Sequence, residues 1–155
     1  MIRRTATTLL ACCALATAVA GCDGRLLLPS AQTTRDLARA RAAWTAQRIT
    51  SYDFTLQRLC FCGETRPMRV TVRDGQVTMV RPEGELLPLP AAEASWYPSI
   101  EGLFDVIATA LALPAARVEA EYDAIRGFPH SVSIDYYSGV ADDEVSYLVS
   151  DIRVQ

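Results

Sequence analysis

Residues 69–80 have the sequence RVTVRDGQVTMV, in which Asp74-Gly75 separates two short runs that alternate apolar with polar residues. An Asp-Gly pair between alternating runs is the strongest short-range signal for a two-residue β-hairpin. The expected register places apolar side chains opposite one another across the two strands, Val72 with Val77 and Val70 with Met79. The stretch therefore predicts a hairpin of antiparallel strands.

Period-two alternation predicts further strands on both sides of this hairpin. Upstream, one face of an expected strand carries Tyr52, Phe54, Leu56, Cys60 and Cys62. Downstream, strands are expected at residues 117–123, 131–136 and 144–154. In the last of these the apolar phase slips between Tyr147 and Leu148, which indicates a β-bulge.

Two segments have the spacing of amphipathic helices. Residues 34–49 place Leu37, Ala40 and Trp44 on one face, with Thr34 as the expected cap. A second helix is expected to begin after Ser99 and to end near residue 113. Residues 82–98 precede it and are rich in proline, so they predict a long irregular loop.

The elements follow one order twice, a helix and then three strands. This order predicts an α+β fold, a tandem α-β-β-β pseudo-repeat that forms an antiparallel sheet with two helices packed on one face. Chance likeness between short valine-rich strands is the alternative explanation of the repeat. Residues 31–155 are expected to form one domain, since a chain of 155 residues without its N-terminal segment has the size of an ordinary domain.

The N-terminal segment predicts export. Arg3-Arg4 is followed by an uncharged run rich in alanine, and the small residues 19–21 precede Cys22. This pattern is typical of a signal peptide over residues 1–21, and it resembles the lipobox of bacterial lipoproteins. The resemblance implies that Cys22 carries a diacylglyceryl group and that residues 22–30 are a lipidated tether. Two acyl chains on one residue suffice for stable anchoring, whereas a membrane-spanning anchor is the alternative for the uncharged run.

Composition and the absence of certain motifs exclude several classes of function. The formal net charge is −3, and removal of Arg3 and Arg4 with the signal peptide would make the mature chain more acidic. Nucleic acid binding needs a basic surface, so no nucleic acid partner is expected. The sequence has no glycine-rich phosphate loop and no Gly-x-Ser-x-Gly elbow, and His130 is its one histidine. Neither a catalytic set nor a cofactor is predicted, and the question of enzymatic activity stays open.

Cys60-Phe61-Cys62 is the sharpest chemical feature. Residues two apart on an extended strand lie roughly 6.5–7 Å apart, at or beyond the usual Cα separation for a disulfide. A bridge would therefore require a bend or bulge. Outside the cytoplasm the pair would meet oxidising conditions. The pair is either a structural bridge or buried thiols, or it is a labile, redox-active disulfide.

Acidic residues gather near the expected loop before the last strand, namely Asp135, Asp142, Asp143 and Glu144. Hard cations such as calcium bind several oxygen ligands, but this spacing does not match an EF-hand. A solvated acidic loop explains the cluster without a metal, so no metal site is predicted from it.

Several motifs together resemble one bacterial family, domain of unknown function 6174, over residues 37–154. They are Trp44, Tyr52-x-Phe54, Cys60-x-Cys62, Asp74-Gly75, Leu103-Phe104, Tyr122-Asp123-x-x-x-Gly127-Phe128-Pro129, Asp135 and Asp142-Asp143-Glu144. The resemblance implies an exported protein, often a lipoprotein, and brings no assigned activity. The Gly-Phe-Pro turn is also similar to small PepSY-like envelope modules, which implies binding or inhibition of a partner.

These observations predict a lipid-anchored module of the cell envelope without enzymatic activity. It would associate with the membrane through Cys22 and bind an envelope protein or a small ligand, through the sheet or through residues 82–98. The inner and outer membranes are both open as its location. The alternative, from another class, is a thiol-redox protein that uses Cys60 and Cys62.

Overall fold

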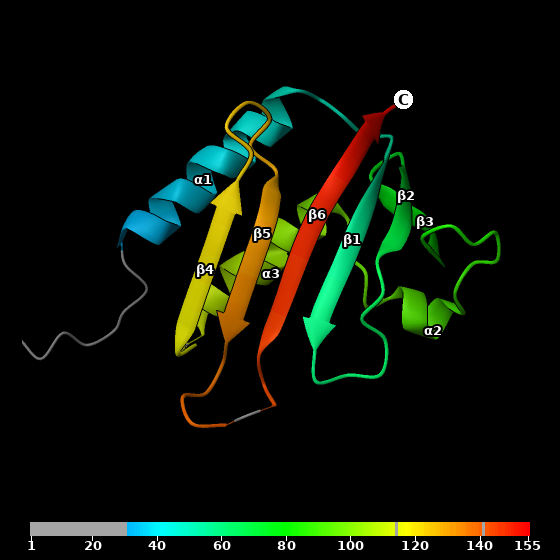
Figure 1. Ribbon diagram of the computed structural model, residues 1–155. Coiled ribbons are helices and arrows are strands. Elements are labelled where there is room, and N and C mark those ends of the chain that lie inside the picture. Colours follow the sequence, from blue (N-terminus) through cyan, green and yellow to red (C-terminus); the bar gives the residue numbers. More distant parts are fainter. Residues whose placement is uncertain (1–30, 114, 141) are drawn as a thin grey trace, which may run out of the picture.

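The computed structural model describes residues 31–155 except 114 and 141 (Figure 1). The expected signal peptide, the tether and Cys22 lie outside the described residues. The elements in chain order are α1 (Ala31–Ala46), β1 (Tyr52–Cys60), β2 (Met68–Arg73), β3 (Gln76–Pro82), α2 (Ala91–Ala94), α3 (Ile100–Ala112), β4 (Arg117–Tyr122), β5 (Pro129–Asp135) and β6 (Val145–Val154).

The strands form one six-stranded antiparallel sheet in the order β3-β2-β1-β6-β5-β4. Helices α1 and α3 pack against each other and lie on the same face of the sheet, and the opposite face is turned toward the viewer in Figure 1. The predicted α+β class is confirmed. The order of helix and three strands occurs twice, with the short α2 inserted before α3.

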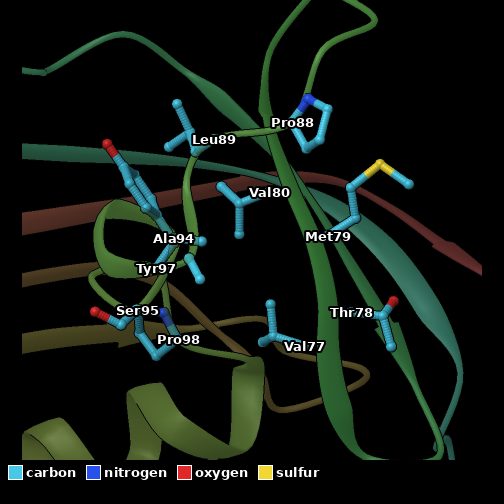
Figure 2. A pocket seen from close by; sticks show the side chains of 11 residues that line it. Val77, Thr78, Met79, Val80, Pro88, Leu89, Ala94, Ser95, Tyr97 and Pro98 are labelled. Carbon is cyan, nitrogen blue, oxygen red and sulfur yellow. The ribbon is translucent and has the colours of Figure 1, made fainter.

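The predicted hairpin is present, but its register differs in one half. Val72 lies opposite Val77 as expected, whereas Val70 lies opposite Val80 and Met79 lies opposite Thr71. The register shifts because β3 has an extra residue in this stretch, a β-bulge. As a result Val77 and Val80 point to the same side of the strand (Figure 2).

The bulge predicted in the last strand lies elsewhere. The pairing of β6 with β1 and β5 runs through Tyr147 and Leu148 without a shift. The register shifts farther along β6. Asp53 of β1 lies opposite Arg153, whereas Thr55 lies opposite Ser150, so β6 has one extra residue near Asp151, whose φ is 51°. The prediction at 147–148 is wrong because Leu148 is a half-exposed apolar residue on the open face and does not mark a change of phase.

One of three predicted element ends lies where it was expected, and two do not. Ser99 caps α3 as predicted, since its Oγ accepts a hydrogen bond from the Gly102 N–H at 3.2 Å. The first helix begins at Ala31, ahead of the predicted cap at Thr34. Strand β1 ends at Cys60, two residues before the predicted strand end at Cys62.

A carboxylate joins three elements beneath the sheet. Glu101, in the first turn of α3, accepts hydrogen bonds from Trp44 Nε1 at 2.7 Å and from the Tyr52 hydroxyl at 2.6 Å. The Tyr52 oxygen in turn accepts a hydrogen bond from the Ile100 N–H at 3.0 Å. Burial and the neighbouring Glu101 carboxylate raise the pKa of Tyr52. The arrangement ties α1, β1 and α3 together.

The Tyr-Asp-x-x-x-Gly-Phe-Pro segment forms the turn between β4 and β5 and packs against α1. Asp123 Oδ1 accepts hydrogen bonds from two backbone N–H groups of the turn, at 3.0 and 2.6 Å. Gly127 has a φ of +80°, and a Cβ there would lie 2.5 Å from the Ala40 carbonyl oxygen. The ring of Phe128 meets that of Trp44 edge to face, with centroids 6.2 Å apart. This motif therefore has a packing role in the fold.

Candidate functional site

A pocket of about 530 Å³ lies between the edge strand β3 and the segment that leads into α3. Figure 2 shows Val77 and Val80 on one side of it and Tyr97 and Pro98 on the other. We call this the β3 groove, lined by Val77, Thr78, Met79, Val80, Pro88, Leu89, Ala91, Ala94, Ser95, Tyr97 and Pro98. Its volume is in the range of ordinary ligand pockets.

No charged side chain lines the β3 groove, and its lining is mostly apolar. Two of the hydroxyls in the lining already donate hydrogen bonds to backbone carbonyls. Ser95 Oγ donates to the Ala92 oxygen at 2.6 Å, and Thr78 Oγ1 donates to the Thr71 oxygen at 3.3 Å. The groove is therefore suited to an uncharged, apolar group.

Strand β3 offers a backbone edge beside the groove. Its end is covered, because the Leu89 N–H donates to the Val80 oxygen at 2.7 Å. The residues before it, 76–79, are exposed. Gln76 lies opposite Arg73 across the two-residue turn, so the alternation of an antiparallel ladder directs the backbone N–H and C=O of Val77 away from β2.

Exposed apolar side chains also occur in the segment between β3 and α3. Leu86 and Leu87 are 90% and 79% exposed, and Trp96 beyond α2 is half exposed. Exposed large apolar residues that gather beside a pocket mark interaction sites more often than scattered ones do. Residues of the predicted binding loop and of the edge strand therefore line the same groove.

The two cysteines are joined by a disulfide at the end of β1, with Cα atoms 5.1 Å apart. The chain turns at Phe61, where the Cys62 N–H donates to the Cys60 oxygen at 2.7 Å. This turn brings the Cα atoms closer than an extended strand would allow. A loop of about three residues contributes only about 1.6 kcal/mol through loop closure, against about 3 kcal/mol for fifteen residues.

Arg58 lies beside the disulfide. Its Nη1 is 3.5 Å from Cys62 Sγ, and its guanidinium carbon is 5.8 Å from the ring centre of Trp96. Neither Arg58 nor Trp96 was predicted from the sequence as a site residue. The aromatic pair Trp96-Tyr97 inside the proline-rich residues 82–98 was the available signal for the tryptophan, whereas nothing in the sequence pointed to Arg58.

The four residues of the acidic cluster do not converge on one point in the structure. Asp143 Oδ2 accepts a hydrogen bond from the Tyr137 N–H at 2.5 Å, and Asp142 and Glu144 line a shallow hollow beside Cys60. Asp135 ends β5, and one of its oxygens is buried without a hydrogen-bond partner. Within residues 31–155, apart from 114 and 141, no three His, Cys, Asp or Glu side chains lie close enough to hold a metal ion.

An ion network lies on the open face of the sheet. The Arg69 side chain is 9% exposed and donates to Asp151 Oδ2 at 2.5 Å and to Glu83 Oε1 at 3.2 Å. The hydrogen bond from Arg69 lowers the pKa of Asp151. Burial by itself would raise the pKa of Glu83. Hydrogen bonds from Arg69 and Thr55 have the larger effect, so the pKa of Glu83 lies below its usual value. The network fastens β1, β2 and β6 at the site of the β6 bulge.

His130 lies at the start of β5, and its Nε2 is 3.8 Å from a carboxylate oxygen of Glu121. Both side chains are well exposed. This exposure explains the histidine as a surface residue.

The chain belongs to the Family of unknown function DUF6174, whose match covers residues 36–154. No curated protein matches this chain. In the part of the chain that the structure describes, no helix is both long and apolar enough to cross a membrane.

Proposed function

We propose that this protein is an exported, lipid-anchored module of the cell envelope that binds an extended apolar segment of another protein in the β3 groove. In this proposal the β3 groove binds its partner and carries out no reaction. The observation that carries the binding function is the apolar pocket directly beside the exposed edge of β3.

A polypeptide is the occupant that fits both features. An added strand would satisfy the outward N–H and C=O of Val77 through main-chain hydrogen bonds, which is the mode called β-augmentation. Alternate side chains of that strand would point to one side and fill the pocket. A small polar molecule would find no charged side chain in the lining, and the Thr78 and Ser95 hydroxyls already donate to carbonyls.

Peptide selection tests this proposal. Random peptides of about 12 residues displayed on phage are selected on the purified chain, and enriched peptides are measured by fluorescence anisotropy. Ala91→Trp places a large side chain at an exposed position of the groove lining. It should weaken binding at least tenfold. Ala92→Trp, the next position of α2 and outside the lining, should leave the Kd within about twofold.

Val77→Pro provides the second arm. Proline removes one N–H, and edge strands tolerate this loss where the N–H does not join the ladder. The variant should remain folded and lose peptide binding. Enriched peptides that bind Ala91→Trp and Val77→Pro as well as the unchanged chain contradict the groove, as does a selection that enriches nothing.

The anchoring half of the proposal rests on residues 1–22 of the sequence. The apolar run and the small residues before Cys22 support cleavage and acylation. Growth of a bacterial host with labelled palmitate should label the unchanged chain and leave Cys22→Ala unlabelled. An unlabelled chain, or a leader that stays uncut, would contradict the anchoring without affecting the groove.

A further inference from the structure

We infer that Cys60 and Cys62 form a thiol–disulfide exchange site, in which Cys62 is the attacking sulfur and Arg58 stabilises its thiolate. The site takes the disulfide of another protein as its substrate. It is independent of the β3 groove, since it lies at the end of β1 and uses none of the residues that line the groove.

The pair is placed where a partner can reach it. Strand β1 ends at Cys60, and the turn that follows presents Phe61 with 83% of its surface exposed. The two cysteines, Phe61 and Gly63 line a shallow surface hollow. A Cβ on Gly63 would meet nothing within 4 Å, so the approach from that side is open. An exposed aromatic residue between the sulfurs offers contact area to an incoming chain.

The surroundings of the two sulfurs differ in charge. Arg58 Nη1 lies 3.5 Å from Cys62 Sγ, and the guanidinium is held over the Trp96 ring. Cys62 Sγ also lies 3.8 Å from the Glu64 backbone oxygen, and the carboxylate of Glu64 is paired with Arg66 at 2.8 Å. On the other side, Cys60 shares a hollow with Asp142 and Glu144. A nearby cation favours a thiolate and nearby carboxylates disfavour it. In the reduced pair the negative charge therefore resides on Cys62.

A purely structural bridge explains this disulfide poorly. Stabilisation through loop closure grows with the length of the closed loop, and here the sequence separation is only two. The end of β1 is already held by its pairing with β6, where Cys60 lies opposite Val145. The bridge therefore adds little to a fold that its neighbours already fix.

The reaction balances between the reduced pair and a partner disulfide. Cys62 thiolate attacks one sulfur of the partner, the partner S–S bond breaks, and its second sulfur leaves as a thiolate that takes up a proton. Cys60 then loses its proton and attacks Cys62 Sγ. The Cys60–Cys62 bond forms, and the first partner sulfur leaves and is protonated. Two electrons pass to the partner, and the bridged state seen here is restored to dithiol by an external dithiol protein.

Alkylation kinetics test the assignment on the full chain, reduced with dithiothreitol and then freed of it. Trypsin cleaves after Arg58 and Arg69 but not at the Arg66-Pro67 bond, so one peptide, 59–69, carries both thiols and fragment masses tell them apart. At pH 7, iodoacetamide should modify Cys62 at least tenfold faster than Cys60. Arg58→Gln should slow the reaction of Cys62 about tenfold, because the thiolate loses the cation beside it.

Matched variants show whether the effect on Cys62 comes from Arg58 beside the sulfur or from any positive charge in the same segment. Arg66→Gln removes the same charge from the same segment, but Arg66 pairs with Glu64 and Glu85 at 2.8 Å and has no bond to sulfur. It should change the rate of Cys62 less than twofold. Arg58→Lys keeps the charge and should stay within about threefold of the unchanged chain, which also covers the case in which Arg58→Gln does not fold.

Oxidised glutathione tests the exchange itself. Cys60→Ser should retain glutathione on Cys62, Cys62→Ser should acquire it at least tenfold more slowly, and the reduced unchanged chain should form the Cys60–Cys62 bond and release glutathione. Equal rates at the two sulfurs overturn the inference. So do equal effects of Arg58→Gln and Arg66→Gln, and so does a glutathione adduct that the unchanged chain cannot resolve.

Discussion

Gly127→Ala should be among the most damaging small substitutions in this protein. Gly127 has a φ of +80°, and an added Cβ would lie 2.5 Å from the Ala40 carbonyl oxygen and 2.9 Å from the Ala43 Cβ. Left-handed backbone costs a residue with a Cβ about 1–2 kcal/mol. Overpacking against α1 costs a further 1–3 kcal/mol or so. The free energy of unfolding should therefore fall by about 2–5 kcal/mol, a large share of the roughly 5–15 kcal/mol of a typical domain.

Gly84→Ala is the matched control. Gly84 has nearly the same φ, +82°, but a Cβ there would meet nothing within 4 Å. It should lose only the conformational part, about 1–2 kcal/mol. Urea unfolding followed by tryptophan fluorescence measures both variants, and an unchanged m-value shows that the comparison is of stability alone.

The difference between the two variants isolates the contact between the Gly127 turn and α1. Trp44 on α1 packs against Phe128, the residue after Gly127, so its fluorescence reports on this contact directly. Equal losses for Gly127→Ala and Gly84→Ala would refute the reasoning. They would mean that the turn moves away from the helix at little cost.

Two further predictions concern polar groups. Glu101→Gln should lower the free energy of unfolding by about 1–3 kcal/mol, because an amide oxygen cannot replace both carboxylate oxygens. Asp105→Asn breaks an exposed ion pair and should lower it by less than about 1 kcal/mol. Equal losses for the two variants in urea unfolding would contradict the role of Glu101 in joining the three elements. The pKa values of Asp151 and Glu83 are lower in the folded state than in the unfolded state, where they are 3.8 and 4.5. The two carboxylates therefore contribute their full stabilisation of the fold above these unfolded pKa values, and the stabilisation is lost as the pH falls through the folded-state pKa values. The Tm should therefore fall on acidification below about pH 4.5, and less steeply in Arg69→Met; parallel Tm profiles for the two proteins would remove Arg69 as the cause.

The candidate sites were only partly readable from the sequence. The proline-rich residues 82–98 were predicted as a binding region, but the pocket also needs β3, whose position at the sheet edge depends on strand order. Arg58 and Cys62 are four residues apart, and on an extended strand they would be roughly 13 Å apart. The turn at Phe61 brings the guanidinium within 3.5 Å of the sulfur. No pattern of residues along the chain predicts the contact between Arg58 and Cys62.

The sequence by itself determined the elements of this protein. The Asp74-Gly75 turn, the Ser99 cap and the alternation of apolar residues act over a few neighbouring positions, and each led to the element that the structure contains. Only the tertiary structure decided the strand order, the exposed edge of β3 and the bulges in β3 and β6. Those features depend on which distant strands pair, because a bulge or an edge is a property of two strands and their register and not of one.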